Sequence, residues 1–354
     1  MTDSTPQPNR SQRVSRWQSR VDAIASNDTA LYALKRVGQA LLTLLLASLL
    51  SFAIIQLAPG NYLDTLRQNP QISPETIADL TARFGLDKPA IVQYGLWLRN
   101  VILRGDFGES FIYNRSVTAL IAERVPATLL LAVTSTIATW AIAIPLGIVG
   151  AVQQNQFSDR VLRTLSYLGQ GFPSFITALL LLILAQNTSP LFPVGGMTSL
   201  DFDSLSLPQK VLDVAWHALL PTVALSITSF AGLQRIARGE LLDVLRQDYI
   251  QTARAKGLPE NRVLYVHALR NAINPLITLL GFEFASLLGG AFIAEYFFSW
   301  PGLGRLILQA VFAQDIYLVM ASLLMGALML IVGNFLADLA LKFADPRIRL
   351  ENIN

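Results

Sequence analysis

The chain has 354 residues, of which 53% are hydrophobic and only 14% are charged, and its net charge is +3. Soluble domains carry charge on about a quarter of their residues, so this composition excludes an ordinary soluble protein and indicates an integral membrane protein. There is no cysteine and there are two histidines, His217 and His267, which excludes disulfides and argues against a metal site in this chain. The basic residues lie beside apolar runs, where they set membrane orientation, and do not indicate nucleic-acid binding.

The N-terminus is polar and basic without apolar periodicity, and we expect residues 1–33 to form a disordered cytoplasmic tail. The first apolar run follows at residues 34–57. A cleavable secretory signal also begins with basic residues, but this run is closer in length to a full membrane span. We therefore expect an uncleaved first transmembrane helix.

Residues 58–126 are polar and long enough to form an outer subdomain on the periplasmic side. Ser73 and Pro74 are typical of an N-cap and first helical position, and they predict a helix that ends near Gly85. A second helix is predicted over residues 90–103. Its Trp97 is expected to pack at the bilayer interface.

Five further apolar runs complete an all-α integral membrane fold of six transmembrane helices. Proline and glycine in the second run predict a kink, and residues 169–174 weaken the third run. Residues 127–345 would form the main membrane unit, followed by a cytoplasmic tail over 346–354. The five runs cover residues 127–152, 165–184, 214–230, 276–293 and 318–341.

The charges test this topology. The loop after the fifth run contains one basic residue, Arg305, against Glu295 and Asp315. The loop after the fourth run, at residues 236–272, has an excess of basic residues, so it is expected in the cytoplasm together with both termini. Its neighbourhood contains Arg235, Arg238, Arg246, Arg254, Lys256, Arg262 and Arg270.

This basic loop has a helical pattern of its own. Gly257 is suited to end a helix that begins at Asp248, because glycine adopts the left-handed conformation at little cost. Pro259 is suited to the first turn of a second helix, on which Val263, Val266, Leu269 and Ile273 recur at helical spacing. Composition alone leaves two roles open, docking to a protein partner or lying on anionic lipid.

Common catalytic and nucleotide-binding motifs are missing. No Gly-x-x-x-x-Gly-Lys-Ser/Thr loop occurs, and the 302–304 segment Gly-Leu-Gly lacks the third glycine of a dinucleotide site. Neither His-Glu-x-x-His nor Gly-x-Ser-x-Gly occurs, which argues against an intramembrane protease. The chain is therefore not expected to bind nucleotide phosphates in a loop of this kind.

Six segments together resemble the inner-membrane permease subunits of ATP-binding-cassette (ABC) importers, in the dipeptide/oligopeptide/nickel branch. Three of them lie in the second half of the chain, with the sequences DYIQTARAKGL, HALRNAINP and FSWPGLG. The resemblance extends from about residue 34 to residue 350. The segments cover residues 105–110, 121–127, 248–258, 267–275, 298–304 and 345–350.

The resemblance implies a type I ABC importer permease core that forms half of a translocation pathway in the bacterial inner membrane. It implies a second permease subunit, two ATPase subunits that bind ATP and magnesium, and an extracytoplasmic solute-binding protein. This chain would bind no cofactor and catalyse no reaction. Arg270 stands where many importers have proline, which fits the peptide branch. The residues implied to contact an ATPase are Gln251, Thr252, Ala253, Arg254, Ala255, Lys256, Gly257 and Leu258.

Four residues are candidates for lining the pathway. Glu283 is the one acid inside the fifth run, where a carboxylate is costly unless it faces water or a partner, although a structural hydrogen bond is equally compatible. Trp300 lies in a Trp-Pro-Gly turn that resembles a gate or lining element of the family. Gln170 and Ser174 flank a proline at membrane depth and are weaker candidates.

Two other classes of function remain as alternatives. A channel or carrier driven by an ion gradient would need intramembrane charges or internal repeats, and the sequence shows one lone acid and no convincing repeat. A membrane scaffold without transport is the other. The sequence leaves the substrate open among dipeptides, longer peptides, glutathione-like molecules and nickel chelates.

Overall fold

The computed structural model describes residues 27–57, 60, 62–67 and 73–344, without the side chains of 27–33, 64–66, 278, 281–290 and 337–344. This part is helical and has one isolated β-bridge but no strand, which confirms the all-α prediction. The predicted tails at 1–26 and 346–354 lie outside the described residues. Because helix α2 begins at Asn27, residues 27–33 belong to the first helix and not to a disordered tail.

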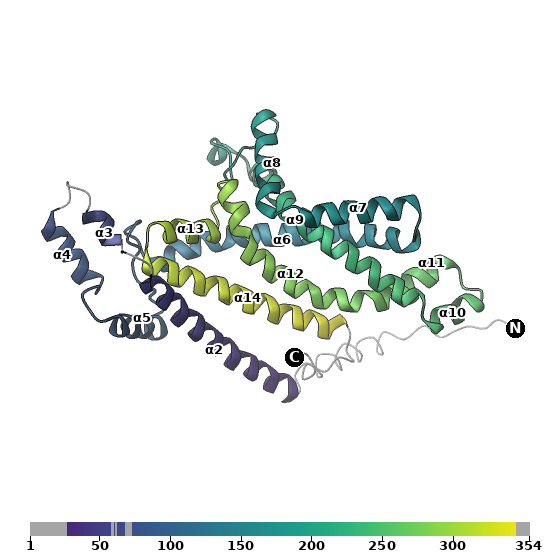
Figure 1. Ribbon diagram of the computed structural model, residues 1–354, viewed down its shortest axis with the longest axis horizontal. Helices are drawn as coiled ribbons and strands as arrows, with labels where there is room; N and C mark the ends of the chain where they lie inside the picture. The colour runs from purple at the N-terminus through teal and green to yellow at the C-terminus, as the bar shows by residue number, and fades with distance from the viewer. Residues whose placement is uncertain (1–26, 58–59, 61, 68–72, 345–354) are drawn as a thin grey trace.

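The described elements follow one another as long membrane helices interrupted by shorter ones (Figure 1). In chain order they are α2 (Asn27–Leu57), α3 (Tyr62–Arg67), α4 (Pro74–Arg83), α5 (Ala90–Arg104), α6 (Val117–Val152), α7 (Phe157–Gly171), α8 (Ser174–Asn187), the 3-10 helix η1 (Phe202–Ser204), α9 (Leu207–Leu245), α10 (Asp248–Ala255), α11 (Glu260–Arg262), the π-helix η2 (Val263–Ala268), α12 (Leu269–Phe297), α13 (Leu303–Phe312) and α14 (Ile316–Ala344).

Four helices of the described part are long and apolar enough to cross a membrane, namely those that contain Leu34–Leu57, Val117–Val152, Leu207–Leu245 and Ile316–Leu336. The pair α7 and α8 would add a fifth span, but it is bent by 98°. The predicted run 276–293 lies inside α12, where many side chains are not described. The multi-pass fold is therefore confirmed, whereas the count of six spans stays a prediction.

Two helices are longer than their apolar runs. Helix α6 begins at Val117, so the predicted outer region 58–126 extends too far. The added turns are held by packing, because Val117, Leu120 and Ile121 are buried against α13 and α14. Helix α9 continues to Leu245, so the first part of the predicted loop 236–272 is helix.

The segment between α2 and α6, predicted to form an outer subdomain, contains the short helices α3, α4 and α5. As predicted, Ser73 caps α4 by accepting the amide hydrogen of Thr76 at 3.2 Å, and the helix ends at Arg83, just before Gly85 with its φ of 65°. Trp97 is buried and donates its indole N–H to the Phe107 carbonyl at 3.2 Å, so it belongs to an apolar core and not to an exposed interface belt. Helices α3 to α5 lie at the opposite end of the molecule from α10 and α11 (Figure 1).

Helices α6 and α9 pack closely along the centre of the fold. A Cβ at Gly147 of α6 would lie 2.8 Å from the Ala237 Cβ of α9 and 3.1 Å from the Gln234 carbonyl. Membrane helices gain little from burying apolar side chains against each other, so small residues that allow close approach determine such contacts. The pair leads directly to α10, which follows the C-terminal end of α9.

Candidate coupling and translocation sites

Helix α10 is short, and one of its faces packs on a cluster of apolar residues from the neighbouring helices, which we call its footing. Ile250 is completely buried and Ala253 nearly so, against Leu241 and Leu242 of α9, Ala151 of α6 and residues of η2. The opposite face of the helix, with Gln251, Thr252 and Ala255, is exposed. The helix is therefore fixed to the membrane helices by one face and presents the other to the surroundings.

The left-handed turn predicted at Gly257 is confirmed. Its φ is +75°, and its amide donates to the Arg254 carbonyl at 2.9 Å. No atom lies within 4 Å of a Cβ built on this residue, so backbone conformation and not crowding requires glycine here. Lys256 and Gly257 are exposed and Leu258 is half-buried, which places the turn at the tip of the loop between α9 and α12.

An ion pair spans this turn. Arg254 donates to both carboxylate oxygens of Glu260, from Nη2 at 2.6 Å and from Nε at 3.2 Å. The hydrogen bond from Arg254 lowers the pKa of Glu260, and the hydrogen bond to Glu260 raises the pKa of Arg254. Both side chains are partly exposed, so the pair fixes the geometry of the turn more than it stabilises the fold.

The second helix of the loop departs from the predicted spacing. Residues Val263–Ala268 form a π-helix, which shifts the inward face relative to an α-helical repeat. Val263 and Leu264 are buried, whereas Val266, predicted on the apolar face, is exposed. Helix α11, η2 and α12 follow one another without a break, so the turn at Gly257 is joined directly to a long membrane helix.

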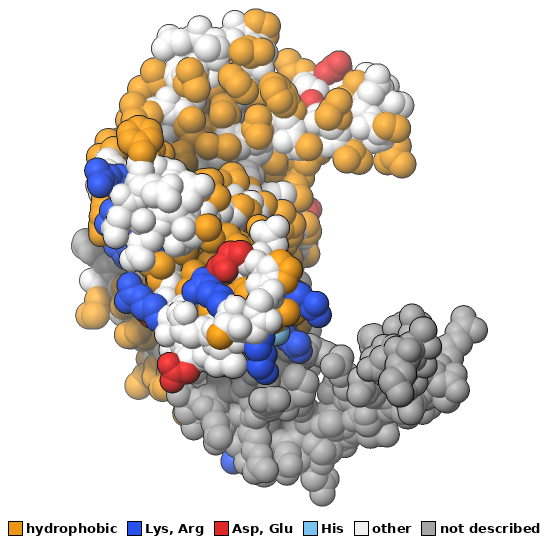
Figure 2. Space-filling view, turned by 90° about the vertical axis from the view of Figure 1, so that its right-hand side faces the viewer, with side chains coloured by type: hydrophobic (Ala, Val, Ile, Leu, Met, Phe, Trp, Pro, Cys, Tyr) orange, Lys and Arg blue, Asp and Glu red, His pale blue; other side chains and the backbone are white. Residues whose placement is uncertain are grey.

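Basic side chains gather at this end of the molecule. Figure 2 shows them over the α10 and α11 end, with few acidic side chains between them. The positive surface agrees with the expected cytoplasmic location, since cytoplasmic loops carry an excess of lysine and arginine. The exposed basic residues of this part of the chain include Arg160, Arg246, Lys256, Arg262 and Arg270.

The third predicted span is broken where its sequence is weakest. Helix α7 ends at Gly171 and α8 begins at Ser174, with Phe172 and Pro173 between them. Gln170 is exposed and Ser174 is half-buried, so the structure brings these two pathway candidates to one bend. Their role in lining a pathway stays a prediction.

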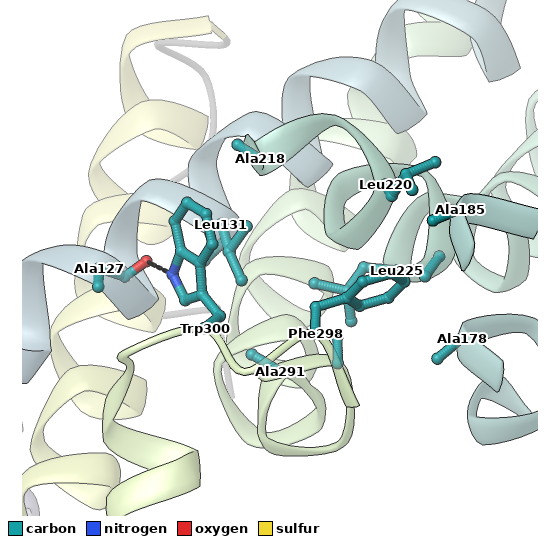
Figure 3. Packing of buried hydrophobic residues seen from close by; sticks show 13 residues of the cluster. Ala127, Leu131, Ala178, Ala185, Ala218, Leu220, Leu225, Ala291, Phe298 and Trp300 are labelled. Carbon is teal, nitrogen blue, oxygen red and sulfur yellow. Dashed lines mark hydrogen bonds between the residues drawn. The ribbon is translucent and has the colours of Figure 1, made fainter. Parts of the chain in front are cut away.

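Trp300 has a different position from the one predicted. It is completely buried and donates its indole N–H to the Ala127 carbonyl at 2.9 Å (Figure 3). In the same cluster Phe298 lies near Leu225 and Ala291. A side chain without exposed surface cannot line a pathway in this conformation. Trp300 is therefore part of the apolar packing between the helices. The side chain of Glu283 lies outside the described residues, although its backbone belongs to α12.

Sequence reasoning placed Glu295 and Asp315 in a loop, but both side chains are completely buried. Glu295 belongs to α12 and accepts hydrogen bonds from the Thr128 hydroxyl at 2.6 Å and the Arg305 amide at 3.0 Å. Asp315 accepts from the Ser110 hydroxyl at 2.6 Å and the Phe111 amide at 2.7 Å. The Trp-Pro-Gly turn between α12 and α13 was the available signal, because such a tight turn needs an acceptor for its free amides.

Metal chemistry has no support in the described part of the chain, where no group of three His, Asp or Glu residues could hold an ion. The buried acids Asp159, Glu295 and Asp315 are held by an arginine side chain, by hydroxyl groups or by backbone amides.

Comparisons with known proteins agree with this picture. Residues 143–350 match the model of the binding-protein-dependent transport system inner membrane component, and residues 30–132 match the N-terminal model of such membrane components. The chain is 38% identical to the oligopeptide transport system permease protein AppB of Bacillus subtilis, over 90% of this chain and 99% of that protein. It is 34% identical to the di/tripeptide transport system permease protein DppB of Pseudomonas aeruginosa, over 89% of this chain and 97% of that protein.

A solved structure shows the same fold. A chain of the MetNI methionine ABC transporter, in inward-facing conformations, superposes with a TM-score of 0.52 at 15% identity, over 64% of this chain and 97% of that one. The family resemblance inferred from the sequence motifs is thus confirmed, as is a multi-pass membrane location. The chain belongs to the binding-protein-dependent transport system inner membrane components, the permease subunits of ABC importers.

Proposed function

We propose that this chain forms one half of the translocation pathway of an ATP-driven peptide importer and that α10 couples it to an ATPase subunit. The observation that carries the proposal is the division of α10 into two faces. Ile250 and Ala253 fix it to α6, α9 and η2, while Gln251, Thr252 and Ala255 remain exposed. A short helix held in this way suits docking into a groove of a partner and moves together with the helices beneath it.

The remaining partners follow from membership in the family. A second permease subunit completes the pathway, and two ATPase subunits with ATP and magnesium supply energy at the basic end. A solute-binding protein delivers substrate at the opposite end, near α3 to α5. Both termini lie in the cytoplasm, in agreement with the basic surface around α10.

Peptides are the proposed substrate class because both bacterial relatives described above are named as peptide permeases. A nickel chelate is the alternative. Uptake of a labelled dipeptide and of a labelled nickel chelate by the reconstituted assembly separates them, and uptake of the chelate alone would replace peptides as the substrate. A carrier driven by an ion gradient would instead transport without the ATPase.

Copurification of the ATPase tests the coupling role. Deleting residues 251–258 is expected to abolish copurification, and the milder substitution Thr252→Trp should do the same because it enlarges the exposed face of α10. Val266→Trp is the matched control, since Val266 is also exposed but lies on η2. Undiminished ATPase binding by both the deletion and the Thr252 variant would refute the proposal.

A further inference from the structure

A set of buried polar contacts ties α7 to α9 just above the footing of α10. Asp159 in the first turn of α7 is completely buried, and Arg238 of α9 donates to both of its oxygens, at 2.7 Å from Nε and 2.9 Å from Nη2. Further along the same two helices, Ser166 donates to the side-chain oxygen of the completely buried Gln234 at 2.6 Å. We call these four residues the polar ladder.

The ladder also reaches α6. Asp159 accepts the amide hydrogen of Asn155 at 2.8 Å, in the turn between α6 and α7. The Gln234 amide nitrogen lies 3.5 Å from the Leu146 carbonyl, and a Cβ at Gly150 would lie 3.2 Å from the Arg238 side chain. Three helices thus meet at one buried polar contact region.

Such contacts matter more between membrane helices than in a soluble protein. Lipid tails surround apolar side chains as well as a protein core does, so apolar burial does not hold α7 in a fixed register on α9. The bidentate pair of Arg238 and Asp159 does hold the register. Moving either helix would leave Arg238 without its carboxylate and would leave the buried Asp159 with only the more distant Arg163 of its own helix, at 3.6 Å, at a cost of several kcal/mol. Arg238 and Asp159 therefore make α9 and α7 move as one body.

The polar ladder lies between the residues that support α10 and the bend between α7 and α8. On one side, α9 ends in Leu241 and Leu242, on which α10 rests. On the other side, α7 leads to the 98° bend and to α8, whose Ala178 and Ala185 pack in the same cluster as Trp300. A displacement of α10 reaches the bend through the ladder.

We propose that Arg238 and Asp159 are positioning residues that transmit the movement of α10 to the bend between α7 and α8. This inference rests on the proposed coupling role of α10 and adds the residues through which that role acts. Asp159 is completely buried and the Arg238 side chain is mostly buried, so neither offers a surface for a partner. Loss of the pair should therefore separate ATP hydrolysis from transport without preventing assembly.

The main test compares Arg238→Gln with wild type in the complete importer reconstituted in liposomes. ATPase copurification should be retained, while transport per ATP hydrolysed should fall by about 5- to 150-fold, the range of typical coupling free energies. The matched control is Arg235→Gln. Arg235 lies on the same helix but is exposed, with its guanidinium over Tyr167, and its loss should leave the ratio unchanged.

A distance measurement distinguishes transmission from a merely structural role. The chain has no cysteine, so each distance can be measured in a variant with two introduced cysteines that carry spin labels, and no native cysteine of this chain has to be replaced. One label pair joins Tyr265 on η2 to Phe312 on α13, and the other joins Phe172 at the bend to Phe312; all three side chains are exposed. ATP with vanadate should change both distances in wild type, but only the first in Arg238→Gln.

Each result has a defined meaning. If both distances still change in Arg238→Gln, or transport per ATP is unaltered, the ladder does not transmit the movement and the inference is wrong. If wild type itself fails to bind an ATPase, the proposed function fails instead. Should Arg238→Gln not assemble, Arg238→Lys takes its place with the same labels; it keeps the charge without the bidentate geometry, so an intermediate ratio supports the inference and a wild-type ratio opposes it.

Discussion

The carboxylate of Glu295 on α12 accepts a 2.6 Å hydrogen bond from the hydroxyl of Thr128 on α6, and that hydroxyl accepts the amide hydrogen of Leu303 at 2.7 Å. These contacts join two membrane helices to the start of α13. Glu295 also accepts from the Arg305 amide, so one buried acid satisfies the free amides of a helix N-terminus.

Removing this acid should destabilise the fold. Glu295→Ala leaves the Thr128 hydroxyl and the Arg305 amide without their acceptor, which costs about 1–3 kcal/mol for each buried group left unpaired. Glu295→Gln keeps one acceptor oxygen and should cost less. Thermal unfolding in detergent measures both, with Glu123→Gln, an exposed glutamate paired with Arg115, as the control. Equal melting temperatures for Glu295→Ala and Glu123→Gln would contradict the role assigned to Glu295.

Glycine is required beside this acid for steric reasons. A Cβ at Gly302 would lie 2.2 Å from the Glu295 carboxylate, and a Cβ at Gly304 would lie 2.3 Å from the Phe292 Cβ. Alanine at either position should therefore lower the melting temperature and the yield of folded protein. Gly326→Ala on α14, where no atom lies within 4 Å of the added Cβ, should be neutral or stabilising. An unchanged melting temperature for Gly304→Ala would show that the turn can repack around the added Cβ, and it would contradict the steric requirement for glycine.

Substitutions at Gly257 test the need for the left-handed backbone conformation separately from steric crowding. Its surroundings are open, so an added side chain acts through the left-handed conformation, at a local cost of about 1–2 kcal/mol. Gly257→Val should leave membrane insertion intact and uncouple ATP hydrolysis from uptake, whereas Gly257→Asn should be milder because asparagine tolerates this conformation. Insertion, ATPase activity and uptake are measured on the same preparations. Normal uptake by the valine variant would refute this view of the turn.

The ion pair between Arg254 and Glu260 predicts a pH dependence. The pKa of Glu260 is lowered by Arg254, so the pair's stabilisation is present above the unfolded value of about 4.3 and is lost as the pH falls through the lower folded pKa. Because the pair is partly exposed, it contributes only about 0.2–1 kcal/mol. Hydrogen exchange of the amides at 256–258 should speed up in Glu260→Gln at neutral pH. At a pH below the folded pKa, mutant and wild type should exchange alike; a persistent difference there would exclude the ion pair as the cause.

Local signals in the sequence predicted local structure well. The φ of Gly257 and the Ser73 cap depend on a few neighbouring residues, and both were predicted correctly. The apolar runs likewise located the membrane helices, because hydrophobicity over about 20 residues is itself the physical requirement for spanning a bilayer. The break at 172–173 coincides with the proline that weakened the predicted third span.

Features that depend on distant partners were missed. The ion pair of Asp159 could not be predicted, because its partner Arg238 is 79 residues away in the chain. Trp300 was expected to line a path, and its burial depends on α6, α8 and α9 packing around it. The π-helix at Val263–Ala268 was not predicted either; its buried residues pack in one cluster with residues of α9 and α10, which lie earlier in the chain.

The bend between α7 and α8 has a consequence for solvation. The last four carbonyls of an α-helix have no partner within it, and in the described part of the chain none of those at 168–171 accepts a backbone hydrogen bond from outside the helix. Irregular backbone at bilayer depth occurs where it is buried in protein or faces a water-filled cavity. With Gln170 exposed beside them, these carbonyls form a short row of acceptors at the bend. A peptide's N–H groups need such acceptors once it has left bulk water.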